Sequence, residues 1–219
     1  MMRLSRYGGN PNIGVFAVAN ESLALVAANS APEFVKDVEE ALGVKVVPTT
    51  VSGSYVVGSL VAMNSNGAVV TGMIEDSEFE RISALIPCMR LSEPSNAAGN
   101  NILVNDSGAI VNPEFSDSTV RELEDFLGVE CVRSSIGDCV TVGSVCRATN
   151  KGCICYMDAS DEEVALIADV LHVEPYKTTV NHGSRVVGAG TVANSKGALV
   201  GDITTPIEMG KVEEGLALY

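Results

Sequence analysis

The chain has 219 residues, of which 46% are apolar and 19% are charged, and its formal net charge is −14. This composition excludes an intrinsically disordered chain, and the length fits one large domain or two small ones. The acidity argues against a protein that holds nucleic acid by its overall charge, because such binding needs an excess of lysine and arginine. It leaves room for a local basic face.

The N-terminus has no apolar segment of the kind found in signal peptides, and no apolar run approaches the roughly 18 residues of a membrane helix. We therefore expect a cytoplasmic protein with no membrane contact. The first predicted element is a strand in residues 2–7, which precedes the repeats described next.

A segment with the same pattern recurs five times along the chain. Each copy has a leading glycine and an Asn or Thr six residues later, and four copies have another glycine nine residues later. The leading glycines are Gly14, Gly58, Gly99, Gly143 and Gly188, at spacings of 44, 41, 44 and 45 residues. The regular spacing predicts a single domain of five units. Units 1 to 5 are placed at residues 8–51, 52–95, 96–136, 137–180, and 181–219 together with 1–7.

Each unit is predicted to begin with a β-hairpin. About seven mostly apolar residues lead into an Asn and Gly turn, and a second apolar run follows it. The Asn and Gly are expected to supply the positive φ of a tight turn. Both strands are nearly continuous in small and β-branched residues, so we expect them to be covered on both faces.

A helix is predicted after each hairpin, followed by a third strand. The helix starts are marked by a Ser or Thr three residues before a Glu, the pattern of a capping box. These pairs are Ser30/Glu33, Ser77/Glu80, Thr119/Glu122, Ser160/Glu163 and Thr205/Glu208. Two helices end at a glycine that suits a left-handed C-cap, and His172 occupies the same position in unit 4. The third strands are expected within residues 44–51, 88–95, 129–136 and 173–180.

The chain ends before unit 5 could form its third strand, while the strand predicted in residues 2–7 has no unit of its own. One arrangement explains both facts: the N-terminal strand completes the last unit and closes an α/β ring of five ββαβ units. Closure also removes the exposed edge that an open array would leave. A WD-type propeller has a similar period, but it needs four strands in each blade and a characteristic Trp, and this chain has no Trp.

Six cysteines are present, and no pair has CxxC spacing. They are Cys88, Cys131, Cys139, Cys146, Cys153 and Cys155. In a reducing compartment they are expected to be free thiols that fill the core of the strands. A zinc site would need further ligands at suitable spacing, and we expect neither a metal nor a cofactor.

The negative charge is concentrated in the predicted helices. The five helix windows carry a net charge of −18, whereas the segments that lead to the five leading glycines carry +3. Two interpretations remain open. The acidic helices can be a solvated outer surface that keeps the protein soluble. Alternatively, they point away from an RNA partner that the strand ends and turns contact.

A five-fold ring of ββαβ units resembles the pentein fold, also called the α/β propeller. Within that fold, the segments NPNIGVFA from Asn10, VGSLVAMNSNGAVV from Val57 and GDITTPIEM from Gly201 resemble the archaeal and eukaryotic translation initiation factor 6 family. The resemblance covers essentially the whole chain. It implies a monomer that acts in translation initiation and ribosome biogenesis by binding the large ribosomal subunit, through ribosomal proteins and rRNA, and preventing association with the small subunit. It also implies that the protein is not an enzyme.

Two alternatives stay open at this point. The pentein fold also hosts guanidine-modifying enzymes, which use a nucleophilic cysteine with a histidine and carboxylates. Only His172 and His182 are available as bases, and the position of His172 suits a helix C-cap better than catalysis. The other alternative is a generic ring scaffold.

The candidate binding residues lie in the turns next to the leading glycines. They are Asn12, Tyr55, Ser59, Asn100, Ser144 and Arg185. Asn100 stands out because its segment, AAGNN, departs from the V-G-S form of units 2 and 4. The resemblance implies that this Asn faces the ribosome, and the alternative is that it only bonds a neighbouring turn.

Overall fold

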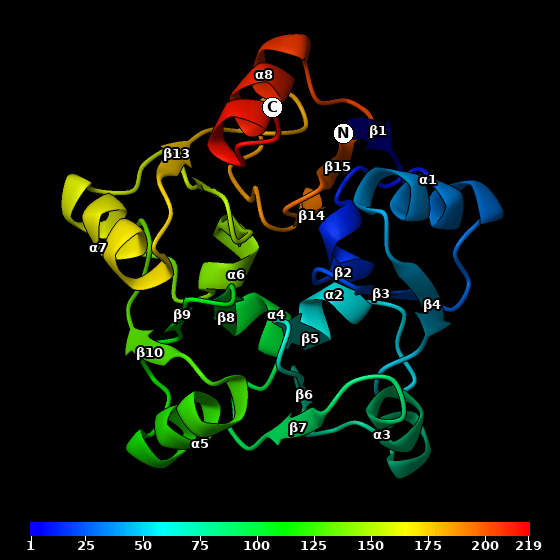
Figure 1. Ribbon diagram of the computed structural model, residues 1–219, viewed down its shortest axis with the longest axis vertical. Helices are drawn as coiled ribbons and strands as arrows, with labels where there is room; N and C mark the ends of the chain where they lie inside the picture. The colour runs from blue at the N-terminus through cyan, green and yellow to red at the C-terminus, as the bar shows by residue number, and fades with distance from the viewer.

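The computed structural model describes residues 1–219 as five three-stranded sheets around the centre of the molecule, with helices on the outside (Figure 1). The sheets are β2 (Ala17–Ala19), β3 (Leu23–Ala27) and β4 (Lys45–Thr49); β5 (Val61–Met63), β6 (Ala68–Thr71) and β7 (Cys88–Leu91); β8 (Ile102–Val104), β9 (Gly108–Val111) and β10 (Glu130–Arg133); β11 (Arg147–Ala148), β12 (Cys153–Cys155) and β13 (Pro175–Lys177); and β14 (Thr191–Asn194), β15 (Gly197–Gly201) and β1 (Met2–Ser5). In every sheet the middle strand pairs antiparallel with the first strand and parallel with the third. The predicted third strands are therefore confirmed.

The helices fall into two groups. The outer ones are α1 (Pro32–Leu42), α3 (Asp76–Ser83), α5 (Asp117–Leu127), α7 (Asp161–Leu171) and α8 (Pro206–Gly215). The inner ones are single turns, η1 (Ile13–Val15), α2 (Val57–Leu60), α4 (Ala98–Asn101) and α6 (Val142–Val145), and Figure 1 shows α2, α4 and α6 around the centre. None of the helices combines the length and the apolar character needed to traverse a lipid bilayer.

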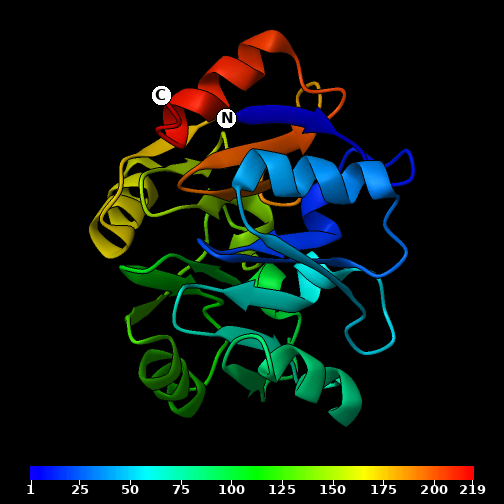
Figure 2. The same cartoon turned by 45° about the vertical axis from the view of Figure 1, so that its right-hand side comes forward.

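The N-terminal strand completes the sheet of unit 5, as the sequence predicted. Strand β1 pairs in parallel with β15, with Met2 opposite Ala198 and Ser5 opposite Gly201. Figure 2 shows β1 lying along β15, near the C-terminal helix. The strand covers residues 2–5 of the predicted 2–7, and Tyr7 lies in the turn that follows.

The predicted hairpins were too long, because the residues around each leading glycine are not extended. In units 2 to 4 they form the single helical turns α2, α4 and α6. A Cβ at Gly58 would lie 2.0 Å from the carbonyl oxygen of Gly14, and each leading glycine meets the preceding one in the same way, with Gly14 against Gly188 at 2.3 Å. A short apolar run does not distinguish a helical turn from a strand. The close contact between the backbones of neighbouring units determines that these residues form helical turns, and only glycine permits that contact.

The Asn and Gly of the hairpin turns have a different role from the one predicted, since none of them has positive φ. Their side chains instead link neighbouring units. Asn20 Nδ2 donates to Asn64 O at 2.8 Å, Asn64 to Asn105 at 3.3 Å, Asn105 to Thr149 at 3.0 Å, and Asn194 to Asn20 at 3.1 Å. Each Oδ1 also accepts backbone N–H groups of its own turn, as an Asx-turn does.

Only two of the five predicted capping boxes are confirmed, those of Ser160 with Glu163 and Thr205 with Glu208. The other three were wrong: Ser77 and Thr119 lie inside α3 and α5, and Ser30 lies one residue before the N-cap Ala31 of α1. Helix α1 follows Ala31 without a side-chain cap, α3 is capped by Glu75 with Glu78, and α5 is capped by Ser116. The left-handed C-caps at Gly43, Gly128 and His172 are confirmed.

The apolar core is divided into five clusters, and each cluster joins two neighbouring units. One of them packs Val192 and Leu199 of unit 5 against Phe34 and Leu42 of unit 1. The others join units 1 and 2, 2 and 3, 3 and 4, and 4 and 5. Since every unit buries its apolar surface against its neighbours, a single unit has no complete core of its own.

Candidate interaction face

The inner helical turns lie at one end of the units, which we call the short-helix face. It comprises residues 6–16, 50–60, 92–101, 134–145 and 178–190. Each of these segments connects a third strand with the hairpin of the next unit. The outer helices, which hold most of the acidic residues, lie around the circumference (Figure 1).

A tight turn precedes the hairpin in four units and is closed by a β-bridge. Examples are Ser52–Gly53, with φ of 56° and 67°, and Gly137–Asp138, with φ of 56° and 61°. In units 2, 4 and 5 the turn is held by the glutamate at the third position of the outer helix. Glu78 accepts N–H groups of Ser52 and Gly53 at 2.6 and 3.0 Å. Each such carboxylate fixes both a helix N-terminus and a turn of the face.

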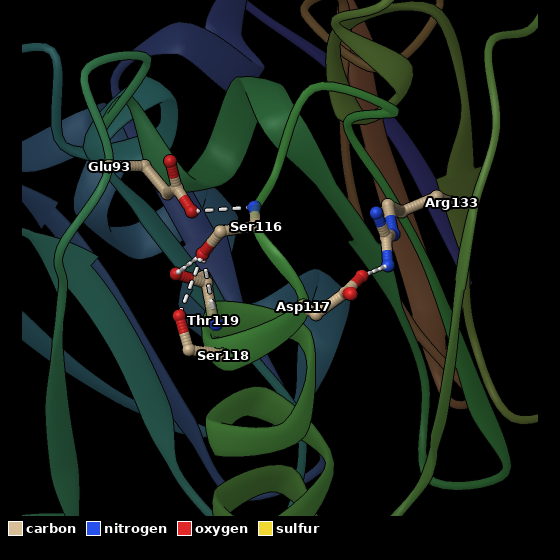
Figure 3. Close-up of polar contacts among 6 residues, drawn as sticks. All are labelled: Glu93, Ser116, Asp117, Ser118, Thr119 and Arg133. Carbon is tan, nitrogen blue, oxygen red and sulfur yellow. Dashed lines mark hydrogen bonds and ion pairs between the residues drawn. The ribbon is translucent and has the colours of Figure 1, made fainter.

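In unit 3 the loop and the helix N-terminus are also joined through a carboxylate, but the loop supplies it instead of the helix, as Figure 3 shows. The third position of α5 is Thr119, so the helix has no carboxylate at the position that holds the turn in units 2, 4 and 5. Glu93, in the loop after β7, accepts the backbone N–H of Ser116 at 2.8 Å instead. Arg133 of β10 forms an ion pair with Asp117 on the same helix turn. The loop around Glu93 lacks the tight turn of the other units.

Three predicted contact residues have side chains that are free to bind a partner. Tyr55 is 45% exposed, Ser59 is half-buried, and neither side chain has a hydrogen-bond partner in the chain. The Asn100 amide likewise bonds no other residue, which argues against the alternative that it only fastens a neighbouring turn. It lines a groove of about 340 Å³ between units 3 and 4, together with Asn96 and Val140.

The other three predicted residues are already engaged within the chain. Asn12 accepts a hydrogen bond from Asn181 Nδ2 at 3.3 Å. The Ser144 hydroxyl donates to the Thr141 carbonyl oxygen at 2.6 Å. Arg185 pairs with Asp158, although both side chains remain more than half exposed. Of these three, Arg185 can still reach a partner, whereas Asn12 and Ser144 chiefly hold the face in shape.

Sequence reasoning missed a set of exposed apolar side chains on the same end of the molecule. The loops after β6, β12 and β15 also reach it, because these strands run antiparallel to strands that start beside the leading glycines. The exposed residues that were missed are Met73, Val140, Met157, Val186 and Ile203, which lie on the same end as the predicted Tyr55; Met73 is 63% exposed and Ile203 is 53% exposed. Apolar residues in loops were the available signal, but their exposure depends on packing that the sequence does not display.

The cysteines lie mostly in the core, as predicted, and all six are free thiols. Burial raises the pKa of Cys155 to about 11 and that of Cys131 to about 12, and it raises the pKa values of Cys146 and Cys153 as well. These thiols are therefore protonated at neutral pH, and a thiol is a poor nucleophile. His172 serves as the C-cap of α7. No group of three or more His, Cys, Asp or Glu side chains is arranged to hold a metal.

Comparison with known proteins adds to this geometry. The model of the eIF-6 family matches residues 2–215. A protein of Methanoculleus marisnigri named translation initiation factor 6 is 41% identical over 206 residues, which is 94% of each chain. Proteins of the same name from Archaeoglobus fulgidus and Thermoplasma acidophilum are 39% and 38% identical, over 94–96% of each chain. The chain thus belongs to the eIF-6 family of translation initiation factors.

Proposed function

We propose that this protein binds the large ribosomal subunit through its short-helix face and so prevents association with the small subunit. The observation that carries the proposal is the groove that Asn100 lines with its free amide. This groove lies among exposed apolar side chains, on a face distinct from the acidic helices. Apolar anchors with uncommitted polar groups are typical of a protein interface. Membership of the eIF-6 family supports the same role in translation.

We infer further that the five units close into a pentein ring, which makes the face rigid. The contact between Gly14 and Gly188, the core cluster shared by units 5 and 1, and the pairing of β1 with β15 support closure. A rigid face binds without an ordering cost, which favours a stable complex.

Co-sedimentation with purified large subunits tests the proposal, followed by a subunit-joining assay. The wild type should bind one copy per large subunit and block joining in proportion to occupancy. Asn100→Arg puts a bulky charged side chain into the groove and should weaken binding at least tenfold. Ser107→Arg, on an exposed hairpin turn at the opposite end, is the matched control and should bind like the wild type. Equal binding of the two variants, both folded, would contradict the proposed face.

The salt dependence of binding tests how the affinity arises. The segments that lead to the leading glycines carry a net charge of only +3, so few phosphates can be neutralised. Using the slope for duplex DNA as a guide, about −0.9 in log affinity per log salt for each phosphate, we expect a shallow dependence. A slope typical of about 6–10 phosphate contacts would show that RNA charge dominates instead.

We also propose that the protein works by occupancy, without turnover, cofactor or metal. A variant with all six cysteines replaced by Ala or Ser should lose some stability but still bind the large subunit. The catalytic alternative would return if a single cysteine replacement abolished binding while circular dichroism and the melting profile stayed unchanged.

A further inference from the structure

A small cavity lies on the axis of the molecule, between the inner turns and the hairpin turns. We call it the axial cavity; Val18, Ala62, Leu103 and Arg147 contribute to its wall, and its volume is about 20 Å³. A cavity needs about 10–15 Å³ on this scale to hold one water molecule. The space therefore admits a water-sized particle and excludes polyatomic anions such as phosphate.

One of the five equivalent positions around this axis carries a charge. Four residues after the leading glycine, units 1, 2 and 3 have Val18, Ala62 and Leu103, which line the cavity, and unit 4 has Arg147; unit 5 has Val192 at this position and contributes the neighbouring Ala193 to the wall. The repeat would place an apolar side chain here as well. The guanidinium therefore stands in a wall that the other units make apolar.

The guanidinium of Arg147 is incompletely paired. Its Nη2 donates to the carbonyl oxygen of Gly188 at 2.8 Å, but its buried Nε has no hydrogen-bond partner. Nearly all buried side-chain donors in proteins have a partner, so an orphaned one on a charged group needs an explanation. Loss of hydration lowers the pKa of Arg147 to about 10, despite the opposing effect of the Cys153 and Cys146 thiols, and the group remains charged at neutral pH.

No carboxylate compensates this charge inside the cavity. The wall contains no Asp or Glu, and Arg147 takes part in none of the salt bridges of the chain. Glu21 and Asp106 lie only at the mouth of the axis, where they accept hydrogen bonds from Ser195 and Ser65 of neighbouring hairpin turns. Arg147 as a whole is partly exposed, but its Nε is buried. A charged group with a desolvated, unpaired donor and no counter-ion is unfavourable, and a small anion beside it would supply both charge balance and a hydrogen-bond acceptor.

We propose that the axial cavity binds a single monatomic anion, chloride, against the guanidinium of Arg147. The size of the cavity excludes larger anions. The unpaired Nε–H of a charged group, with no carboxylate in the wall, favours an anion over a neutral water molecule. The site is independent of the ribosome-binding proposal, because it lies inside the molecule and its test measures stability.

The first experiment compares melting temperatures in sodium chloride and sodium gluconate at constant ionic strength. The wild type should melt about 2–4 °C higher in chloride when chloride is well above its dissociation constant. Arg147→Met removes the charge while keeping the length, and its melting temperature should be the same in both salts. Arg121→Met is the matched control on the exposed face of α5, and it should keep the full chloride effect. An equal effect of chloride on all three proteins would show surface binding only and would overturn the proposal.

The second experiment uses the wild type alone, so it does not depend on the folding of a variant. Crystals grown in sodium bromide should show an anomalous scattering peak beside the guanidinium of Arg147, since bromide replaces chloride at such sites. A water molecule in that position, with no anomalous signal, would overturn the proposal whatever the melting temperatures show.

Discussion

Units 5 and 3 place a carboxylate at the same junction but take it from different segments. In unit 5 the carboxylate of Glu208, the third residue of α8, accepts the N–H groups of His182 and Gly183 at 3.1 and 2.7 Å. In unit 3 the third residue of the helix is Thr119, and Glu93 of the loop reaches toward the helix. Both arrangements bring a negative charge to a helix N-terminus, where the backbone N–H groups and the helix dipole favour it.

The difference shapes the face. In units 2, 4 and 5, where the helix supplies the carboxylate, it holds a tight turn with positive φ, as at His182 and Gly183. Where the loop supplies it, residues 92–97 stay more open and border the groove that Asn100 lines. Unit 3, which departs from the repeat at this junction, is therefore also the unit that contains Asn100, the predicted contact residue whose free amide lines a groove.

The largest expected effect concerns the third strand, which unit 5 takes from the N-terminus and unit 3 from its own continuous chain. Deleting residues 1–7 removes β1 and also Tyr7, which stacks on Phe16 at 3.8 Å. We expect the melting temperature to fall by about 10–20 °C, because losing a strand and its packing costs several kcal/mol. Deleting the exposed Tyr219 should have little effect. A truncated protein as stable as the full chain would show that β1 is dispensable.

The second prediction compares the two carboxylates directly. Glu208→Gln leaves buried N–H donors facing an amide and should lower the free energy of unfolding by about 2 kcal/mol. Glu93→Gln removes a carboxylate that is less buried and should cost about 1 kcal/mol. Urea unfolding measures both, with Glu162→Gln on the exposed surface of α7 as the control, expected within about 0.5 kcal/mol of the wild type. The reverse order would contradict the conclusion that the burial of the carboxylate sets its contribution to stability.

The third prediction is the pH dependence of the same group. Burial alone would raise the pKa of Glu208, but hydrogen bonds from Thr205, Thr179 and Gly183 outweigh it and lower the pKa from 4.5 to about 2. A carboxyl with a lowered pKa stabilises the fold above its unfolded pKa, and this contribution is lost as the pH falls toward 2. The difference in unfolding free energy between the wild type and Glu208→Gln should therefore shrink between pH 6 and pH 3. A constant difference would exclude this role of the charge.

The smallest expected effect tests whether the carboxylate can be moved. Thr119→Glu gives α5 the glutamate that α3, α7 and α8 have at their third position. Introduced into Glu93→Gln, it should restore about 0.5–1 kcal/mol by supplying a charge and a capping box at the helix N-terminus. Introduced into the wild type, it should destabilise the protein, because two carboxylates would then meet. If the effects of Thr119→Glu and Glu93→Gln on the free energy of unfolding simply added, the idea that one carboxylate can replace the other would be refuted.

The residues that the sequence analysis singled out divide by the kind of contact they make. Asn64 and Gly58 mark the repeat correctly, yet their roles were missed, because both act on a neighbouring unit rather than on their own turn. Asn100 and Ser144 occupy equivalent positions, and only the folded structure shows that one amide is free while the other side chain is engaged. The position of a residue in the repeat therefore does not predict its hydrogen-bond partner.

The sequence by itself determined the five units, the α/β class, the outer helices and the pairing of β1 with β15. These features follow from periodicity and from a count of strands, which local residue types encode. The tertiary structure alone decided the helical turns at the leading glycines, the caps of α1, α3 and α5, and the isolation of Arg147. Each of these depends on how closely segments from different parts of the chain approach, and on which hydrogen-bond partners that approach leaves within reach.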